Sequence, residues 1–232
     1  MLDTDNESSK DLNVWISIAD LFAGLLLIMI IGLVAALHGR KDIQISNELG
    51  KAMTQAASLT KKMQEKLNAI RPGLTSQTPH SETEVVIPAG ALFEKLKYDD
   101  YLRDPAKKQL LTDIRSAVKQ TIDEAGDERK FFRIVIEGHT DSDPIGERNA
   151  TEAIPTNWEL SSRRATGVLR FFEEGGLNAK EYNIVALGLA DTDQVAPNTT
   201  EQEKSLNRRI VIRVEPIIEK MRMEAVNASD RK

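Results

Sequence analysis

The 232-residue sequence predicts an α/β protein with a single N-terminal transmembrane helix, a helical stalk that extends it, and a two-layer α/β domain. Three observations support this fold class. A continuous apolar run covers residues 14–37, and a helical periodicity with no proline follows over residues 38–71. Strand-like and helix-like segments then alternate over residues 83–215, which is the pattern of a sheet covered by helices.

Composition excludes several classes of function. The chain carries 31 Lys and Arg against 36 Asp and Glu, a formal net charge of −5. Nucleic acid is not an expected partner, because phosphate contacts need a basic stripe. The absence of cysteine excludes disulfides, thiolate metal sites and a cysteine nucleophile.

The apolar run is long enough to cross a bilayer. Its 24 residues would extend roughly 36 Å as a helix. A cleaved signal peptide is the alternative. However, the run is longer than a signal h-region, no basic segment precedes it, and the flanking sequence at residues 38–41 (HGRK) is not a small-residue cleavage site. We therefore expect one uncleaved span.

The orientation of the span rests on two opposing arguments. Lys10 is the one basic residue of the acidic tail 1–13, whereas Arg40 and Lys41 follow the span. Positive charge alone would place the C-terminal side inside the cell. The C-terminal domain identified below argues for the reverse, and we follow it: residues 1–13 form a cytoplasmic tail, and the domain is periplasmic at the inner membrane.

Residues 38–71 carry a heptad-like seam that allows two interpretations. Steps of four and three residues separate its apolar or small members, Ile45, Leu49, Ala52, Ala56, Leu59 and Met63. Lys66 interrupts the seam, and Leu67 and Ile70 resume it. The segment is either an amphipathic helix that packs on another part of the protein, or a coiled-coil stalk that pairs with a second copy.

Pro72 and Gly73 end this helix, and residues 72–82 read as a linker. In the domain at 83–215, strands are expected at 83–87, 131–137, 182–187 and 208–214. Helices are expected from Pro105 to near Gly126 and over 158–174, with loops at 138–156 and 191–205. The tail 216–232 is expected to contain a short charged helix.

Asp20 lies inside the apolar run. Inserting a carboxylate at the centre of a membrane span costs about 2.5–3.5 kcal/mol on insertion scales, so such a residue usually has a function. Desolvation favours its protonated form, so Asp20 is a candidate to load and release a proton. Ser17 could bond the carboxylate, and Gly24 permits a close neighbour. A packing hydrogen bond is the structural alternative. Ion flow would require another membrane subunit, because a lone helix has no second wall for a pore.

Three motifs in the domain resemble a known family. They are Glu137-Gly-His-Thr-Asp141, the segment 157–165 (NWELSSRRA) and Asn207-Arg-Arg209. In this order they resemble the OmpA-like peptidoglycan-binding domain, over about residues 83–215. The resemblance implies that Asp141 and Arg164 hold the diaminopimelate group of a wall peptide. This ligand carries an ammonium and a carboxylate, so it needs one fixed anion and one fork of donors.

The remaining peptidoglycan-binding candidates are Thr140, Asn157 and Arg208. We expect Asn157 at a helix N-cap, where exposed N–H groups attract a carboxylate. Arg208 and Arg209 could instead form ion pairs with a loop or with Glu137. Asp141 could simply cap a loop, and Arg164 could be a surface helix residue. The loop between Asp141 and Asn157 looks longer than usual in the family and could cover the groove.

No catalytic or metal-binding set is expected. The histidines His38, His80 and His139 have no ligand spacing between them. No nucleophile–base pair and no phosphate loop are recognisable, so we expect a protein that is not an enzyme and needs no cofactor.

The span and the domain together resemble the B subunit of ion-driven stators, of the flagellar MotB type. The matching stretch of the span is residues 15–27 (WISIADLFAGLLL). The resemblance implies a dimer held inside a ring of MotA-like subunits, in which Asp20 passes protons. Ser17, which could bond the Asp20 carboxylate, is the second candidate residue for ion translocation. The acidic tail and the long seam depart from flagellar members. These departures favour the B subunit (ZorB) of Zorya anti-phage defence systems, with a ZorA-type ring partner.

Two alternatives remain open. One is a flagellar-type stator subunit, and the other is a passive peptidoglycan anchor without ion flow.

Overall fold

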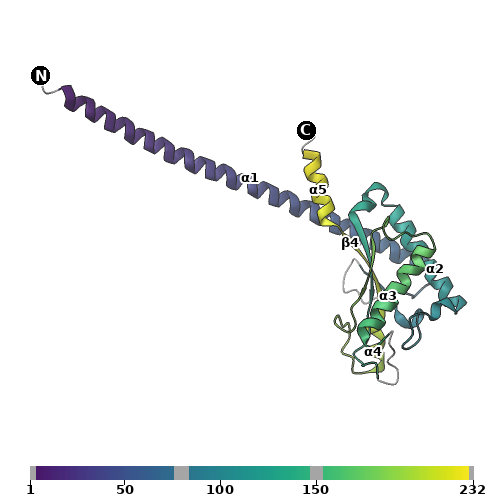
Figure 1. Ribbon diagram of the computed structural model, residues 1–232. Helices are drawn as coiled ribbons and strands as arrows, with labels where there is room; N and C mark the ends of the chain where they lie inside the picture. The colour runs from purple at the N-terminus through teal and green to yellow at the C-terminus, as the bar shows by residue number, and fades with distance from the viewer. Residues whose placement is uncertain (1–3, 76–83, 147–153, 230–232) are drawn as a thin grey trace. The chain divides into compact units, whose positions relative to one another are not determined.

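The structure is a computed structural model that describes residues 4–75, 84–146 and 154–229 (Figure 1). The chain divides into two compact units, Met1–Gly50 and Lys51–Lys232. Helix α1 (Thr4–Ile70) contributes residues to both units.

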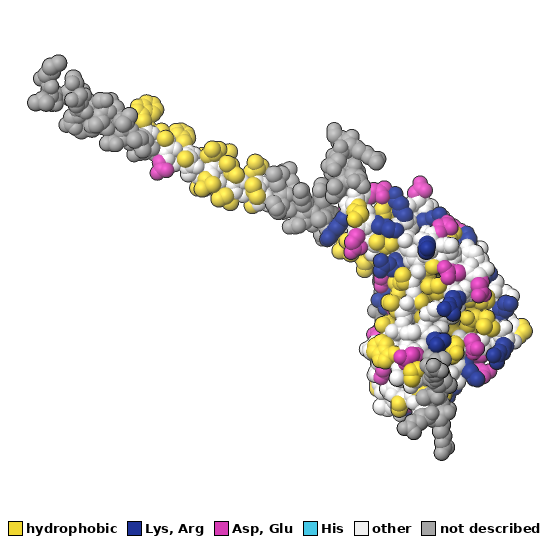
Figure 2. Space-filling model, in the orientation of Figure 1, with side chains coloured by type: hydrophobic (Ala, Val, Ile, Leu, Met, Phe, Trp, Pro, Cys, Tyr) yellow, Lys and Arg dark blue, Asp and Glu magenta, His cyan; other side chains and the backbone are white. Residues whose placement is uncertain are grey.

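The first unit contains an apolar helical segment. Ile18–Ala36 is 19 residues long, has a mean hydropathy of 2.6 and buries none of its side chains within the chain. Figure 2 shows hydrophobic side chains covering its described part. A helix that is apolar all round is stable in apolar surroundings, so the segment is long and apolar enough to cross a membrane. The predicted N-terminal apolar helix is confirmed. The side chain of Ser17 lies outside the described residues.

The second unit contains a four-stranded sheet in the order β1-β4-β2-β3. Strand β4 is antiparallel to both β1 and β2, whereas β3 runs parallel to β2. Every strand lies within about two residues of its predicted position. The strands are β1 (Glu84–Pro88), β2 (Phe132–Gly138), β3 (Ile184–Gly188) and β4 (Arg209–Pro216).

Helices form a second layer against one face of this sheet, and the predicted α/β fold is confirmed. Helices α2 (Pro105–Asp123) and α3 (Asn157–Glu174) belong to this layer, and the other α-helices after the sheet begins are α4 (Glu201–Asn207) and α5 (Ile218–Ser229). Short 3₁₀ segments are η1 (Ala89–Ala91), η2 (Asp100–Leu102) and η3 (Gly126–Phe131). The core joins apolar side chains of both layers, including Ile114 and Val118 of α2, Val168 and Phe172 of α3, and Ile136 and Ile212 of the sheet.

Capping residues predicted the start of one helix correctly and the N-cap of another incorrectly. Helix α2 begins at Pro105 as predicted, because Asp104 accepts a hydrogen bond from the backbone N–H of Ala106 at 2.8 Å. The predicted N-cap of α3 was wrong: the cap is Thr156, and Asn157 is the first helical residue. Thr156 forms a capping box with Glu159, which leaves Asn157 free of that role.

Helix α4 corrects a second expectation, because it occupies part of the segment 191–205 that was predicted as a loop. A capping box between Thr200 and Glu203 starts it. The Thr-x-x-Glu spacing was visible in the sequence, but no apolar run followed it to indicate a helix.

The seam on α1 packs into its own domain. The exposed fraction does not exceed 7% for any of its members Ala52, Ala56, Leu59, Met63 and Leu67. Four of these, all but Ala52, belong to the hydrophobic core of the second unit. Residues 52–67 therefore follow the first of the two interpretations, in which the helix packs on another part of the protein.

Polar contacts flank this packed face. Gln64 donates through Nε2 to the carbonyl of Glu84 at 2.9 Å. Lys66, which interrupts the seam in the sequence, reaches Glu124 with its Nζ at 2.8 Å. The compact unit thus begins at Lys51, within the segment expected to be a stalk. Residues 76–82 of the expected linker, and residue 83 of the expected domain, lie outside the described part of the chain.

Two methionines on α1 offer a matched test. Met63 is fully buried, whereas Met53 is 48% exposed. Met63→Ala should lower the free energy of unfolding of the second unit by about 2–5 kcal/mol, because it leaves a cavity in the core. Met53→Ala should change it by less than about 0.5 kcal/mol. Denaturant unfolding of the full chain in detergent would measure both values, and equal effects would contradict this packing.

Candidate functional site

The pairing of β2 with β4 brings two of the sequence motifs to one end of the sheet. Gly138 lies opposite Ile210 in the register, and the backbone N–H of His139 donates to the carbonyl of Arg209 at 3.0 Å. The residues that follow β2 therefore meet those that precede β4. Nη1 of Arg208 lies 2.5 Å from Oδ2 of Asp141.

The α3 helix reaches the same place because Gly138 allows it to lie close to β2. A Cβ atom at position 138 would stand 2.2 Å from the carbonyl oxygen of Ser161 on α3. Any side chain there would push the helix away, so the motif requires glycine at this position.

One cavity collects all five side chains predicted to bind peptidoglycan. Its volume is about 160 Å³, and its lining includes Thr140, Asp141, Asn157, Arg164 and Arg208. The structure thus brings these residues together, and their roles in binding stay predictions.

Asp141 is buried, and both of its carboxylate oxygens have a partner. One carboxylate oxygen pairs with Arg208, and the other accepts a hydrogen bond from the backbone N–H of Asp143 at 3.3 Å. Arg208 also contacts Glu201, with Nη2 and Oε1 2.5 Å apart. Burial lowers the pKa of Arg208, but its hydrogen bonds to Asp141 and Glu201 raise it by more, so the pKa ends above its ordinary value.

The alternative pairing of these arginines with Glu137 is wrong. Glu137 contacts Arg213, with Oε2 and Nη2 3.1 Å apart. Arg209 is buried and pairs with Asp193, 2.9 Å away, in the loop between β3 and α4. Burial lowers the pKa of Arg209. Both arginines of the motif therefore form ion pairs with loops.

Arg164 is a buried residue with an exposed fraction of 3%, not a surface helix residue. Its Nε donates to the carbonyl of Lys97 at 2.8 Å, and Nη2 donates to the carbonyl of Glu94 at 3.1 Å. Burial lowers its pKa to about 10, so the guanidinium remains charged at neutral pH. Arg164 therefore both fixes the loop at 94–97 and brings a positive charge to the cavity.

Asn157 and Thr140 complete the predicted set in different ways. Nδ2 of Asn157 donates to the carbonyl of Asp143 at 2.9 Å and so ties α3 to the loop after β2. The hydroxyl of Thr140 is buried and has no hydrogen-bond partner within the described part of the chain. Buried hydroxyls without a partner are uncommon, so Thr140 is suited to bond a ligand in the cavity.

Sequence reasoning missed two charged residues that line the cavity, Lys95 and Asp143. Nζ of Lys204 lies 2.6 Å from Oδ1 of Asp143 and lowers the pKa of that carboxyl. No motif marks these residues, because loop packing alone places them there. The cavity thus combines three positive side chains with two carboxylates, which suits a zwitterionic ligand.

Two other expectations concern the surroundings of the cavity. Pro144, Ile145 and Gly146 of the long loop line it, but residues 147–153 lie outside the described part. Among the described residues there is no group of three or more His, Asp or Glu able to hold a metal.

Comparisons with known proteins identify similarities to the second unit. Residues 104–208 match the model of the OmpA family. The uncharacterised protein YtxE of Bacillus subtilis is 42% identical over 80 residues, which cover 34% of this chain and 31% of that protein. The match thus spans under a third of the length of that curated relative.

Two solved structures share the fold. A protein described as MotB-like from Desulfovibrio vulgaris aligns with a TM-score of 0.57 and 22% identity, over 73% of this chain and 94% of that one. The periplasmic domain of Helicobacter pylori MotB aligns with a TM-score of 0.50 and 17% identity, over 68% and 100%. The second unit therefore contains a segment that matches the OmpA family model, and it shares its fold with these two structures.

Proposed function

We propose that this protein is a membrane subunit anchored to peptidoglycan, of the stator B type. The observation that carries the proposal is the single cavity that gathers Thr140, Asp141, Asn157, Arg164 and Arg208. These residues belong to three motifs that lie far apart in the sequence.

The charges of the cavity match the end of a diaminopimelate-containing peptide. The ammonium group would approach Asp141 and Asp143, and the carboxylate would approach Arg164 and Arg208. The Asp141–Arg208 pair compensates a buried carboxylate before any ligand arrives, which avoids the large cost of an unpaired buried charge. The site can therefore stay folded without its ligand.

The apolar segment Ile18–Ala36 would hold the protein in the inner membrane as a single span. Because peptidoglycan lies outside that membrane, the second unit would be periplasmic and the N-terminus cytoplasmic.

Asp20 extends the proposal from an anchor to a motor. It is the one ionisable residue between Ile18 and Ala36. An aspartate in lipid needs a polar partner, and a neighbouring membrane subunit could supply it. We propose that a MotA-like ring of the ZorA type surrounds a dimer of this chain, that Asp20 relays protons, and that the complex acts in anti-phage defence.

Wall binding can be tested on purified sacculi. Asp141→Ala combined with Arg164→Ala should reduce binding of the full chain by at least roughly tenfold, because two charge-assisted contacts disappear. Since Arg164 is buried, Thr140→Val provides a milder variant that keeps the side-chain shape. It should fold normally and bind several-fold more weakly.

A control exchanges the same residue types at exposed positions, with Asp127→Ala and Arg133→Ala. Sedimentation with sacculi measures binding, and circular dichroism verifies folding. If folded variants of the cavity sediment as well as the unmodified protein, wall binding through this cavity is wrong.

The motor role depends on proton release from Asp20. Asp20→Asn should keep membrane assembly but abolish proton flux and phage resistance, because an amide does not release a proton. Met29→Leu in the same segment should change neither. Proton uptake by vesicles and plating efficiency of phage provide the two measurements. If Asp20→Asn keeps full activity, the motor role is wrong and the protein is a passive anchor. If the variant loses swimming but keeps phage resistance, the protein is a flagellar stator subunit.

A further inference from the structure

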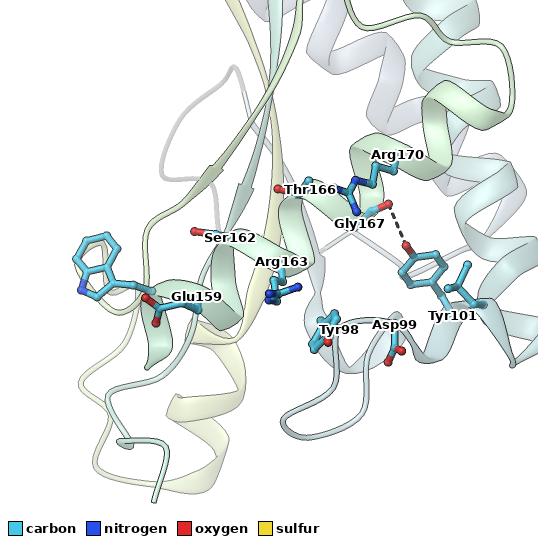
Figure 3. Close-up of a pocket in the computed structure, with 11 residues that line it drawn as sticks. Tyr98, Asp99, Tyr101, Glu159, Ser162, Arg163, Thr166, Gly167 and Arg170 are labelled. Carbon is cyan, nitrogen blue, oxygen red and sulfur yellow. Dashed lines mark hydrogen bonds between the residues drawn. The ribbon is translucent and has the colours of Figure 1, made fainter. Parts of the chain in front are cut away.

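A second, larger cavity lies beside α3 and is distinct from the one described above. This groove has a volume of about 500 Å³ and lies between α3 and the segment that contains η2 (Figure 3). The residues that matter here are Tyr98, Asp99, Trp158, Glu159, Arg163 and Arg170. Trp158, Glu159 and Arg163 lie within the motif at 157–165, whereas Tyr98, Asp99 and Arg170 lie outside all three motifs.

The floor of the groove is held in place by close packing. The hydroxyl of Tyr101 donates to the carbonyl of Gly167 at 3.1 Å (Figure 3). A Cβ atom at position 167 would stand 3.1 Å from that hydroxyl oxygen and 3.4 Å from the carbonyl oxygen of Tyr98. The ring of Tyr101 also packs edge-on against Phe93 and Phe171. The groove is therefore preformed, which lowers the entropic cost of binding.

The chemistry of the groove suits an uncharged polar ligand with apolar faces. The guanidinium of Arg163 points toward Tyr98 and lies 5.3 Å from the centre of its ring (Figure 3). Arg163 and Arg170 balance Asp99 and Glu159, so the lining carries no excess charge. Hydroxyl and acetamido groups can bond such side chains, while the C–H faces of a sugar ring can stack on aromatic ones.

The groove and the first cavity are adjacent. Helix α3 contributes Leu160 and Arg164 to the cavity, and the next face of the same helix contributes Glu159, Arg163 and Arg170 to the groove. The loop before η2 is shared too, because Lys95 and Leu96 line the cavity whereas Tyr98 and Asp99 line the groove. One ligand that reaches across this loop can occupy both.

The groove is long enough for a sugar unit. From Trp158 to Arg170, α3 extends roughly 18 Å along its axis. The indole of Trp158 is 51% exposed, so an aromatic surface is accessible on this helix. In peptidoglycan, the peptide is covalently attached to an amino-sugar chain, so a bound peptide brings a sugar close to its own site.

We infer that the groove binds the glycan of the same peptidoglycan fragment whose peptide enters the cavity. This inference rests on the proposed wall binding and adds a sugar subsite to it. Tyr98, Arg163 and Arg170 are the residues that recognise the sugar.

Two probes separate the subsites: a disaccharide–peptide released from sacculi by muramidase, and the same peptide without its sugars. Calorimetry of the full chain in detergent should show that the disaccharide–peptide binds about tenfold more tightly. Tyr98→Ala and Arg170→Ala, made separately, and Tyr98→Ala with Arg163→Ala should remove most of this advantage. Each variant should bind the free peptide as the unmodified protein does, which also shows that it is folded.

Arg133→Ala is the control, because Arg133 is an exposed arginine on the opposite face of the sheet. Several results would overturn the inference. The groove variants could keep the full affinity for the disaccharide–peptide, or lose affinity for both probes equally. They could also change the oligomeric state alone, which would make the groove an interface between copies. If the unmodified protein binds neither probe, the proposed wall binding itself fails.

Discussion

The antiparallel register between β2 and β4 determines the geometry of the candidate site. It places Gly138 opposite Ile210, so the end of one strand and the start of the other coincide. Asp141 and Arg208 are brought within 2.5 Å of each other as a consequence. A slip of one residue would turn every side chain of a strand to the other face, so the register is strongly specified by the apolar side chains that face the helices.

Arg164 is the second element on which the site depends. Its two hydrogen bonds hold the loop at 94–97 against α3, and this loop separates the cavity from the groove. The buried guanidinium of Arg164 is stable here because backbone carbonyls accept hydrogen bonds from it. The centre of the Phe93 ring also lies 5.3 Å from the guanidinium carbon. Arg164 is thus part of the architecture as well as a candidate ligand contact.

Much of this arrangement could be predicted from the sequence. All four strands were predicted to within about two residues, and Asp104-Pro105 marked the start of α2. The cap of α3 could not be assigned with equal ease, since Thr156 and Asn157 are both good capping residues and Glu159 decided between them. The seam on α1 identified a buried face, but periodicity alone does not reveal whether its partner is the same chain or a second copy.

The sequence did not reveal the groove, although Trp158, Glu159 and Arg163 lie in one of its motifs. Tyr98 and Arg163 meet through tertiary packing, at a place where Gly167 leaves room for Tyr101 and the carbonyl of Tyr98 beside α3. Lys95 and Asp143 likewise reach the cavity through loop packing. Such contacts depend on tertiary structure, which short motifs do not encode.

A crystal structure of the full chain bound to a diaminopimelate-containing stem peptide would test the central claim most directly. The account predicts that the ammonium of the peptide lies within hydrogen-bond distance of Asp141 and that its carboxylate contacts Arg164 or Arg208. A peptide bound elsewhere on the domain, with the Asp141–Arg208 cavity left unchanged, would contradict it.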